Sequence, residues 1–173
     1  MSVSGDGREI ERKYVLTAAP TAPADAIHMD LEQGYLAPGP GIDVASPAFA
    51  EGRLRRERHV DGAVVHTHTV KRGAGMVRQE QEREITPAEF DAAWPRTAGA
   101  RIAKHRYEVR VGEHLWVVDE FKGRDLVLAE VEMPRPDENP AVPVWLAPFI
   151  DRDVTDDPAF RNFALARQLA GES

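Results

Sequence analysis

The sequence predicts an α+β domain built on an eight-stranded, antiparallel, closed β-barrel, with a few flanking helices and a C-terminal helix. Eight segments alternate in side-chain character with a period of two, and several are separated by glycine-containing turns. Charged residues also recur on one face of strand after strand, which an ordinary apolar core does not accommodate. We therefore expect a sheet closed around a polar interior, in a single domain over residues 7–170.

The predicted strands share this alternation. They run from about Gly7 to Leu16, His28 to Leu36, Glu51 to Arg58, Ala63 to Lys71, Met76 to Ile85, Ala100 to Arg110, His114 to Phe121 and Leu126 to Met133. Glycines in the connections Asp61-Gly62, Gly73-Ala74-Gly75, Gly112 and Gly123 supply the positive φ of tight turns, which makes most neighbours antiparallel. The stretch from Ala37 to Ala50 is rich in proline and glycine and predicts an irregular surface loop.

Two helices are predicted from their capping residues. Thr86-Pro87-Ala88-Glu89 has the form of a capping box with proline at the first helical position. A second helix is expected to start near Asp157-Pro158 and to carry an apolar stripe that includes Phe163 and Ala166. The chain therefore ends on a helix.

The charges on the strands share one face. Alternation places Glu9, Glu11 and Lys13 together on the first strand, which taken alone is typical of a solvated sheet face. The pattern recurs, however, and the strand around Glu80 is polar on both sides. One register throughout gives an interior with seven carboxylates and seven cations: Glu9, Glu11, Glu80, Glu82, Asp119, Glu130, Glu132, and Lys13, Arg53, Arg55, Lys71, Arg78, Lys104, Arg106.

This balance of charges predicts a ligand that itself carries both signs. Burying ions without strong partners costs several kcal/mol each, so packing alone does not explain them. Arginine and lysine suit phosphate oxygens, and carboxylates without His or Cys suit a hard cation such as Mg²⁺ or Mn²⁺. A metal–polyphosphate complex satisfies both halves of the interior.

Composition excludes several other classes. The formal net charge of −7 and a pI near 5.4 give no general attraction for nucleic acid or anionic membrane. The absence of cysteine excludes disulfides and thiolate chemistry. Met1 to Arg12 contains no apolar signal segment, and no stretch is apolar enough to span a membrane, so we expect a cytoplasmic protein. Whether it forms a homodimer stays open.

A series of motifs resembles the CYTH superfamily, also called the triphosphate tunnel metalloenzymes. They are Glu9-x-Glu11-x-Lys13, Gln33-Gly34-Tyr35-Leu36, Arg53-Leu54-Arg55, Thr69-Val70-Lys71, Arg78-x-Glu80-x-Glu82, Lys104-x-Arg106, Val118-Asp119-x-Phe121, Glu130-Val131-Glu132 and a tail through Arg161-Asn162 to Leu165-Ala166. The tail departs from the pattern at Asp153, at Phe160 and in the stretch Ala147-Pro148-Phe149-Ile150, which puts the C-terminal closure of the tunnel in question.

The resemblance implies an eight-stranded tunnel that acts on a triphosphate with divalent metal. It implies that Glu9, Glu11, Asp119, Glu130 and Glu132 hold Mg²⁺ or Mn²⁺, with Glu80 and Glu82 as candidates for a second ion. It assigns phosphate binding to Lys13, Arg53, Arg55, Lys71, Lys104 and Arg106, and also to Arg78, which is expected in the tunnel beside them. Among these, Lys13, Glu9 and Glu11 are the candidate catalytic residues, although a phosphate clamp is the plainer role for Lys13.

Hydrolysis of inorganic tripolyphosphate to pyrophosphate and phosphate is the activity we expect. A class IV adenylate cyclase, a thiamine or nucleoside triphosphatase, and a non-catalytic polyphosphate or nucleotide binder are the alternatives. A metal site at His66 and His68 is not expected, because both alternate out of register with Thr67, Thr69 and Lys71; we expect them at the surface.

Overall fold

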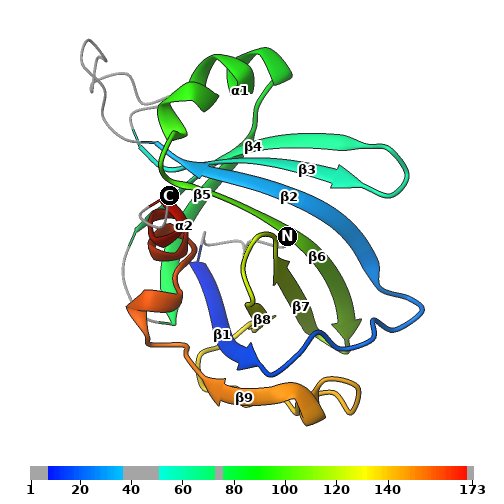
Figure 1. The fold of residues 1–173 in the computed structure, drawn as a ribbon. Helices are drawn as coiled ribbons and strands as arrows, with labels where there is room; N and C mark the ends of the chain where they lie inside the picture. The colour runs from blue at the N-terminus through cyan, green and yellow to red at the C-terminus, as the bar shows by residue number, and fades with distance from the viewer. Residues whose placement is uncertain (1–7, 37–50, 73–75, 171–173) are drawn as a thin grey trace.

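The computed structural model describes residues 8–36, 51–72 and 76–170. Its strands form one antiparallel sheet, and the helices lie around and against it (Figure 1). The strands are β1 (Arg8–Leu16), β2 (Ile27–Tyr35), β3 (Arg53–His59), β4 (Val64–Arg72), β5 (Val77–Glu84), β6 (Arg101–Val111), β7 (His114–Phe121), β8 (Val127–Glu132) and β9 (Ile150–Asp153). The helices are α1 (Pro87–Ala93) and α2 (Asn162–Ala170), with 3₁₀ turns η1 (Trp94–Thr97), η2 (Ala147–Phe149) and η3 (Pro158–Phe160).

Strands β1 to β8 close into a barrel, which confirms the predicted eight-stranded architecture. The order of hydrogen-bonded neighbours is β5-β4-β3-β2-β6-β7-β8-β1, and β5 also pairs with β1. That closing pair places Glu9 opposite Arg78 and Ile10 opposite Val77. On its other edge β1 pairs with β8, so that Lys13 lies opposite Glu130.

A ninth strand was not predicted. Strand β9 pairs with the second half of β1, where Tyr14 lies opposite Asp153, and so occupies the edge that β5 leaves free. The turn η2 leads directly into it, so the stretch after Trp145-Leu146 brings the chain back to the barrel. The strand has only four residues, three of them exposed, and such a segment carries no alternating signal.

The first helix is confirmed, and the start of the second was predicted wrongly. Thr86 caps α1 through the expected capping box: its hydroxyl accepts from the Glu89 amide at 3.2 Å, and its own amide donates to the Glu89 carboxylate at 2.7 Å. Asp157 and Pro158 instead open the 3₁₀ turn η3. Arg161 then adopts an extended backbone (φ −72°, ψ 138°), so α2 begins only at Asn162.

Apolar side chains pack on the outside of the barrel and also plug part of its inside. On the outer face, Ile10, Trp116 and Val131 form a buried cluster with Leu146 from the segment that follows β8. On the inner face, Leu165 and Ala166 of α2 join a second buried cluster with Ile102, Phe121 and Leu128. Since these three barrel residues follow the inward register of Lys104, Asp119 and Glu130, α2 packs inside the barrel wall.

Some sequence predictions lie outside the described residues. These are Gly7, the loop from Ala37 to Ala50 and the turn Gly73-Ala74-Gly75. Among the helices that are described, none is long and apolar enough to cross a membrane.

Candidate active site

A cavity of about 440 Å³ lies within the barrel. The barrel strands line most of it, together with residues 36 and 51–52 next to β2 and β3 and residues 161–163 at the start of α2. Ten of the fourteen predicted site residues line it: Glu9, Glu11, Lys13, Arg53, Arg55, Lys71, Arg78, Arg106, Glu130 and Glu132. Glu80, Glu82 and Asp119 do not line the cavity, but each forms an ion pair with a cation predicted for the site. Lys104 does not line it either, and its ion-pair partner is Asp119. The strand register therefore brings the predicted residues together.

Four glutamates gather where β1 meets β8. Glu11 and Glu132 are directly opposite on the two strands, Glu130 is two residues from Glu132, and Glu9 is two residues from Glu11. Burial raises the pKa of Glu11, and the negative charges of Glu130 and Glu9 raise it further. Burial together with Glu9 and Glu11 raises the pKa of Glu132 to about 7. This carboxylate cluster (Glu9, Glu11, Glu130, Glu132) thus carries mutual repulsion that a bound cation would relieve.

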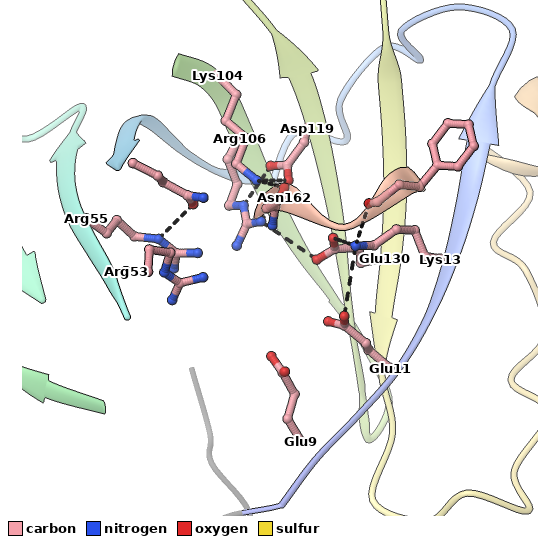
Figure 2. Close-up of polar contacts among 12 residues, drawn as sticks. Glu9, Glu11, Lys13, Arg53, Arg55, Lys104, Arg106, Asp119, Glu130 and Asn162 are labelled. Carbon is pink, nitrogen blue, oxygen red and sulfur yellow. Dashed lines mark hydrogen bonds and ion pairs between the residues drawn. The ribbon is translucent and has the colours of Figure 1, made fainter. Parts of the chain in front are cut away.

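Lys13 lies beside this cluster and stays charged. Its Nζ is 3.0 Å from a Glu130 carboxylate oxygen and donates a hydrogen bond to the Phe160 carbonyl at 3.3 Å (Figure 2). Burial favours a lower pKa, but the charges of Glu130 and Glu11 outweigh it and raise the pKa of Lys13. A lysine held as a cation is suited to binding an anion and is a poor general base.

Arginines form the opposite side of the cavity. Figure 2 shows Arg53 and Arg55 reaching in from β3, across from Lys13 and Glu130. Arg53 donates to Thr69 at 3.0 Å and to Glu82 at 3.3 Å. The pKa of Arg55 falls to about 10, first because of burial and then because Arg53 and Arg106 are close. Cations that repel one another in a buried wall favour an anionic ligand.

Arg106 is oriented by a carboxylate behind the cavity wall. Asp119 accepts hydrogen bonds from Arg106 at 2.7 and 2.8 Å and from Lys104 at 2.5 Å, and all three side chains are at most 2% exposed. Both Asp119 oxygens are therefore used by cations. Burial lowers the pKa of Lys104 to about 7, with a further lowering from Arg106 that Asp119 opposes. Lys104 also donates to Asn162 at 3.4 Å, which ties α2 to the barrel.

Strands β4 and β5 contribute the remaining ion pairs. Lys71 donates to Glu9 at 2.6 and 2.8 Å and lies 3.0 Å from Glu80. Glu80 is buried, and its second carboxylate oxygen has no hydrogen-bond partner. Arg78 donates to both Glu9 and Glu11. Each of these carboxylates is held by cations, and the part of the chain described here contains no ready-formed group of three His, Asp or Glu side chains that could hold a metal ion.

The two candidate histidines point away from the cavity, but the prediction that they lie at the surface was wrong. His66 is 8% exposed and packs on Phe90 of α1, with ring centroids 4.8 Å apart. His68 is 4% exposed, and its Nε2 lies 2.8 Å from the Glu51 carbonyl oxygen. Sequence periodicity gave the direction of these side chains. It did not show that α1 and the segment before β3 would cover them.

Several cavity residues had no predicted role. Tyr35, Arg161, Asn162 and Phe163 line the cavity together with the predicted set. Arg161 and Asn162 stood in the motif series, but their distance from the barrel strands in the sequence gave no reason to place them there. The sequence feature that could have placed them is the apolar stripe of α2, which indicates that this helix packs against another part of the protein.

Comparison with known proteins finds relatives along nearly the whole chain. A protein from Nitrosomonas europaea named inorganic triphosphatase is 33% identical over 163 residues, which cover 93% of this chain and 98% of that protein. A second inorganic triphosphatase, from Acetivibrio thermocellus, is 37% identical over 98 residues, or 54% of this chain and 59% of that protein. No protein-family model matches.

Solved structures agree with this result. The crystal structure of the inorganic triphosphatase NE1496 is 30% identical, covers 92% of this chain and 97% of its own, and superposes with a TM-score of 0.57. The PH1819 protein from Pyrococcus horikoshii, at 17% identity and a TM-score of 0.51, covers 75% of this chain and 80% of its own. The PH1819 protein therefore shares the fold of this chain.

Proposed function

The chain belongs to the inorganic triphosphatase family with the CYTH-type tunnel fold, and on this premise we propose that it hydrolyses inorganic tripolyphosphate to pyrophosphate and phosphate. The observation that carries the proposal is the lining of the cavity, where the carboxylate cluster faces arginines across one shared space. A polyphosphate neutralised in part by a cation matches both sides.

The residues present fit a divalent cation. The carboxylate cluster offers only oxygen donors, which suit Mg²⁺ or Mn²⁺. Burial, and after it the charges of neighbouring glutamates, raises the pKa values of Glu11 and Glu132, and a bound cation would offset both effects. We assign the cation to Glu9, Glu11, Glu130 and Glu132. When bound, it supplies charge neutralisation of phosphoryl oxygens and acidification of a water.

For the residues that do not line the cavity, our assignment differs from the roles that the family resemblance implies. Asp119 uses both oxygens on Arg106 and Lys104, so we propose that it orients Arg106 toward the ligand. Glu80 retains one free buried oxygen and, with Glu82, stays the candidate pair for a second cation. Lys104 is fully buried, and we propose that it acts on the phosphates only through its charge.

The cavity cations perform the binding step. Arg53, Arg55 and Arg106 hold phosphate oxygens with forked guanidinium groups, and Lys13, Lys71 and Arg78 exchange their carboxylate partners for the ligand. Because hydrogen bonds in the cavity wall already hold Arg53, Arg55 and Arg106, charge that develops on the transferred phosphoryl group and on the leaving group meets preorganised cations. Lys13 is a phosphate clamp that stays protonated throughout.

The test is product analysis with a matched pair of variants. The purified protein is given tripolyphosphate, ATP or thiamine triphosphate with Mg²⁺ or Mn²⁺, and orthophosphate, pyrophosphate and cyclic AMP are measured. We expect tripolyphosphate to yield phosphate and pyrophosphate, and Glu130→Gln to lose about a hundredfold or more in rate. The control is Glu120→Gln, on the outer face of β7. Cyclic AMP with pyrophosphate and no orthophosphate would contradict the hydrolase.

A further inference from the structure

Arg161 is a cavity-lining cation that lies outside the barrel strands. It is half-buried and lies between η3 and α2, and it lines both the main cavity and a small adjoining one beside Glu11, Lys13 and Arg78. Within residues 8–36, 51–72 and 76–170, its side chain forms no hydrogen bond and no ion pair. No polar contact within the described residues therefore accounts for its guanidinium.

Unlike Arg161, the other cations that line the cavity all have an ion-pair partner among the described residues. Each has a carboxylate within 4.0 Å: Lys13 has Glu130, Arg53 has Glu82, Arg55 has Glu57, Lys71 has Glu9, Arg78 has Glu11 and Arg106 has Asp119. An incoming anion must compete with these carboxylates. It meets no such competitor at Arg161, so this charge is available without breaking an ion pair.

The backbone around Arg161 is held at the cavity by its neighbours. The Phe160 carbonyl accepts a hydrogen bond from Lys13, and the Asn162 side chain accepts one from Lys104, so both residues beside Arg161 are tied to barrel lysines (Figure 2). Leu165 anchors the start of α2 in the inner apolar cluster and donates its amide to the Arg161 carbonyl at 3.0 Å. The position of the residue is therefore set, and only its side chain is free to meet a ligand.

We propose that Arg161 binds a phosphate group of the triphosphate from the α2 side of the cavity, completing a ring of cations that the barrel strands leave open. The inference rests on the proposed function for the identity of the ligand. A guanidinium fork matches two phosphate oxygens at once, and its partly exposed position lets it reach a ligand that enters from solvent. Its contribution is to affinity, because the contact exists in the ground state and in the transition state alike.

The test compares Arg161→Gln, Arg161→Lys and a control, Arg135→Gln, in steady-state hydrolysis of tripolyphosphate. Arg135 is exposed and pairs with Glu138 away from the cavity, and its substitution by Gln removes the same formal charge as Arg161→Gln. We expect Arg161→Gln to raise KM roughly tenfold with kcat within about twofold, as for loss of uniform binding. Arg161→Lys keeps the charge but not the forked guanidinium, so its KM should lie between those of the wild type and Arg161→Gln. The thermal midpoint should change little, since no hydrogen bond or ion pair among the described residues is lost.

Direct binding separates this inference from the proposed function. Calorimetric titration with tripolyphosphate in the presence of a chelator measures affinity without turnover, and we expect Kd to rise roughly tenfold in Arg161→Gln. If the wild type binds but does not hydrolyse, and the variant binds more weakly, the proposed function falls and the Arg161 contact stands. Equal KM and equal Kd in variant and wild type overturn the contact, as does a wild type that binds no tripolyphosphate.

Discussion

Arg106 and Asp119 form a doubly hydrogen-bonded ion pair in the barrel wall, with Nε to Oδ1 at 2.7 Å and Nη2 to Oδ2 at 2.8 Å. Arg106 lines the cavity and Asp119 does not. The aspartate therefore fixes the plane of a guanidinium that faces the cavity, and it also forms an ion pair with Lys104. One carboxylate is therefore the nearest counterion of two buried cations.

Removing that carboxylate should destabilise the fold. Asp119→Asn keeps the shape but removes the ion-pair partner of Lys104 and leaves Arg106 only the Glu130 carboxylate at 3.8 Å, so we expect the free energy of unfolding to fall by about 3 kcal/mol or more. Urea denaturation measures this. Glu120→Gln, the next residue on the outer face, should change it by less than about 0.5 kcal/mol. Equal stabilities for the two variants would show that Asp119 is not the required counterion.

The pKa of Glu132 predicts a pH-dependent stability in the metal-free protein. Its folded pKa of about 7 lies above the unfolded value of 4.5, so its contribution is fully present below pH 4.5 and is lost as pH rises through 7. Glu132→Gln mimics the protonated form. With chelator present, we expect the variant to gain about 2 kcal/mol over wild type between pH 5 and pH 8, measured by urea denaturation at each pH. A difference that does not change with pH would argue against the raised pKa.

The inner apolar cluster should carry the stability of α2. Leu165 is 1% exposed between α2 and the barrel, and Leu165→Ala is expected to cost about 2–4 kcal/mol in the free energy of unfolding. It should also raise KM for tripolyphosphate, because Arg161 and Asn162 lose their anchor. The exposed neighbour Gln168, changed to Ala, is the control. If activity is intact while stability falls, the helix supports the fold without positioning the cavity lining.

Chelation should abolish turnover if the carboxylate cluster holds the required cation. After treatment with EDTA we expect no tripolyphosphate hydrolysis, with recovery on addition of Mg²⁺ or Mn²⁺. The cation should also raise the thermal midpoint of the wild type, because it relieves repulsion among the glutamates. The same measurement on Glu130→Gln should show a much smaller rise. Full activity in chelator would remove the cation from the mechanism.

Local sequence pattern determined the strands and the direction of their side chains. Alternation along β1 placed Glu9, Glu11 and Lys13 on one face, and all three line the cavity. The same rule turned His66 and His68 outward. These features follow from sequence because a strand has a period of two regardless of its partners.

Only the tertiary structure decided which charges meet and what completes the cavity. The sequence placed Asp119 and Glu130 in one register, yet Asp119 pairs with two cations behind the wall while Glu130 faces the cavity beside Lys13. Barrel closure sets these distances through pairings between strands far apart in the chain. The strand β9 and the position of Arg161 depend in the same way on where the C-terminal segment docks, because neither has a local pattern of its own: their placement comes from long-range contacts with β1, Lys13 and Lys104.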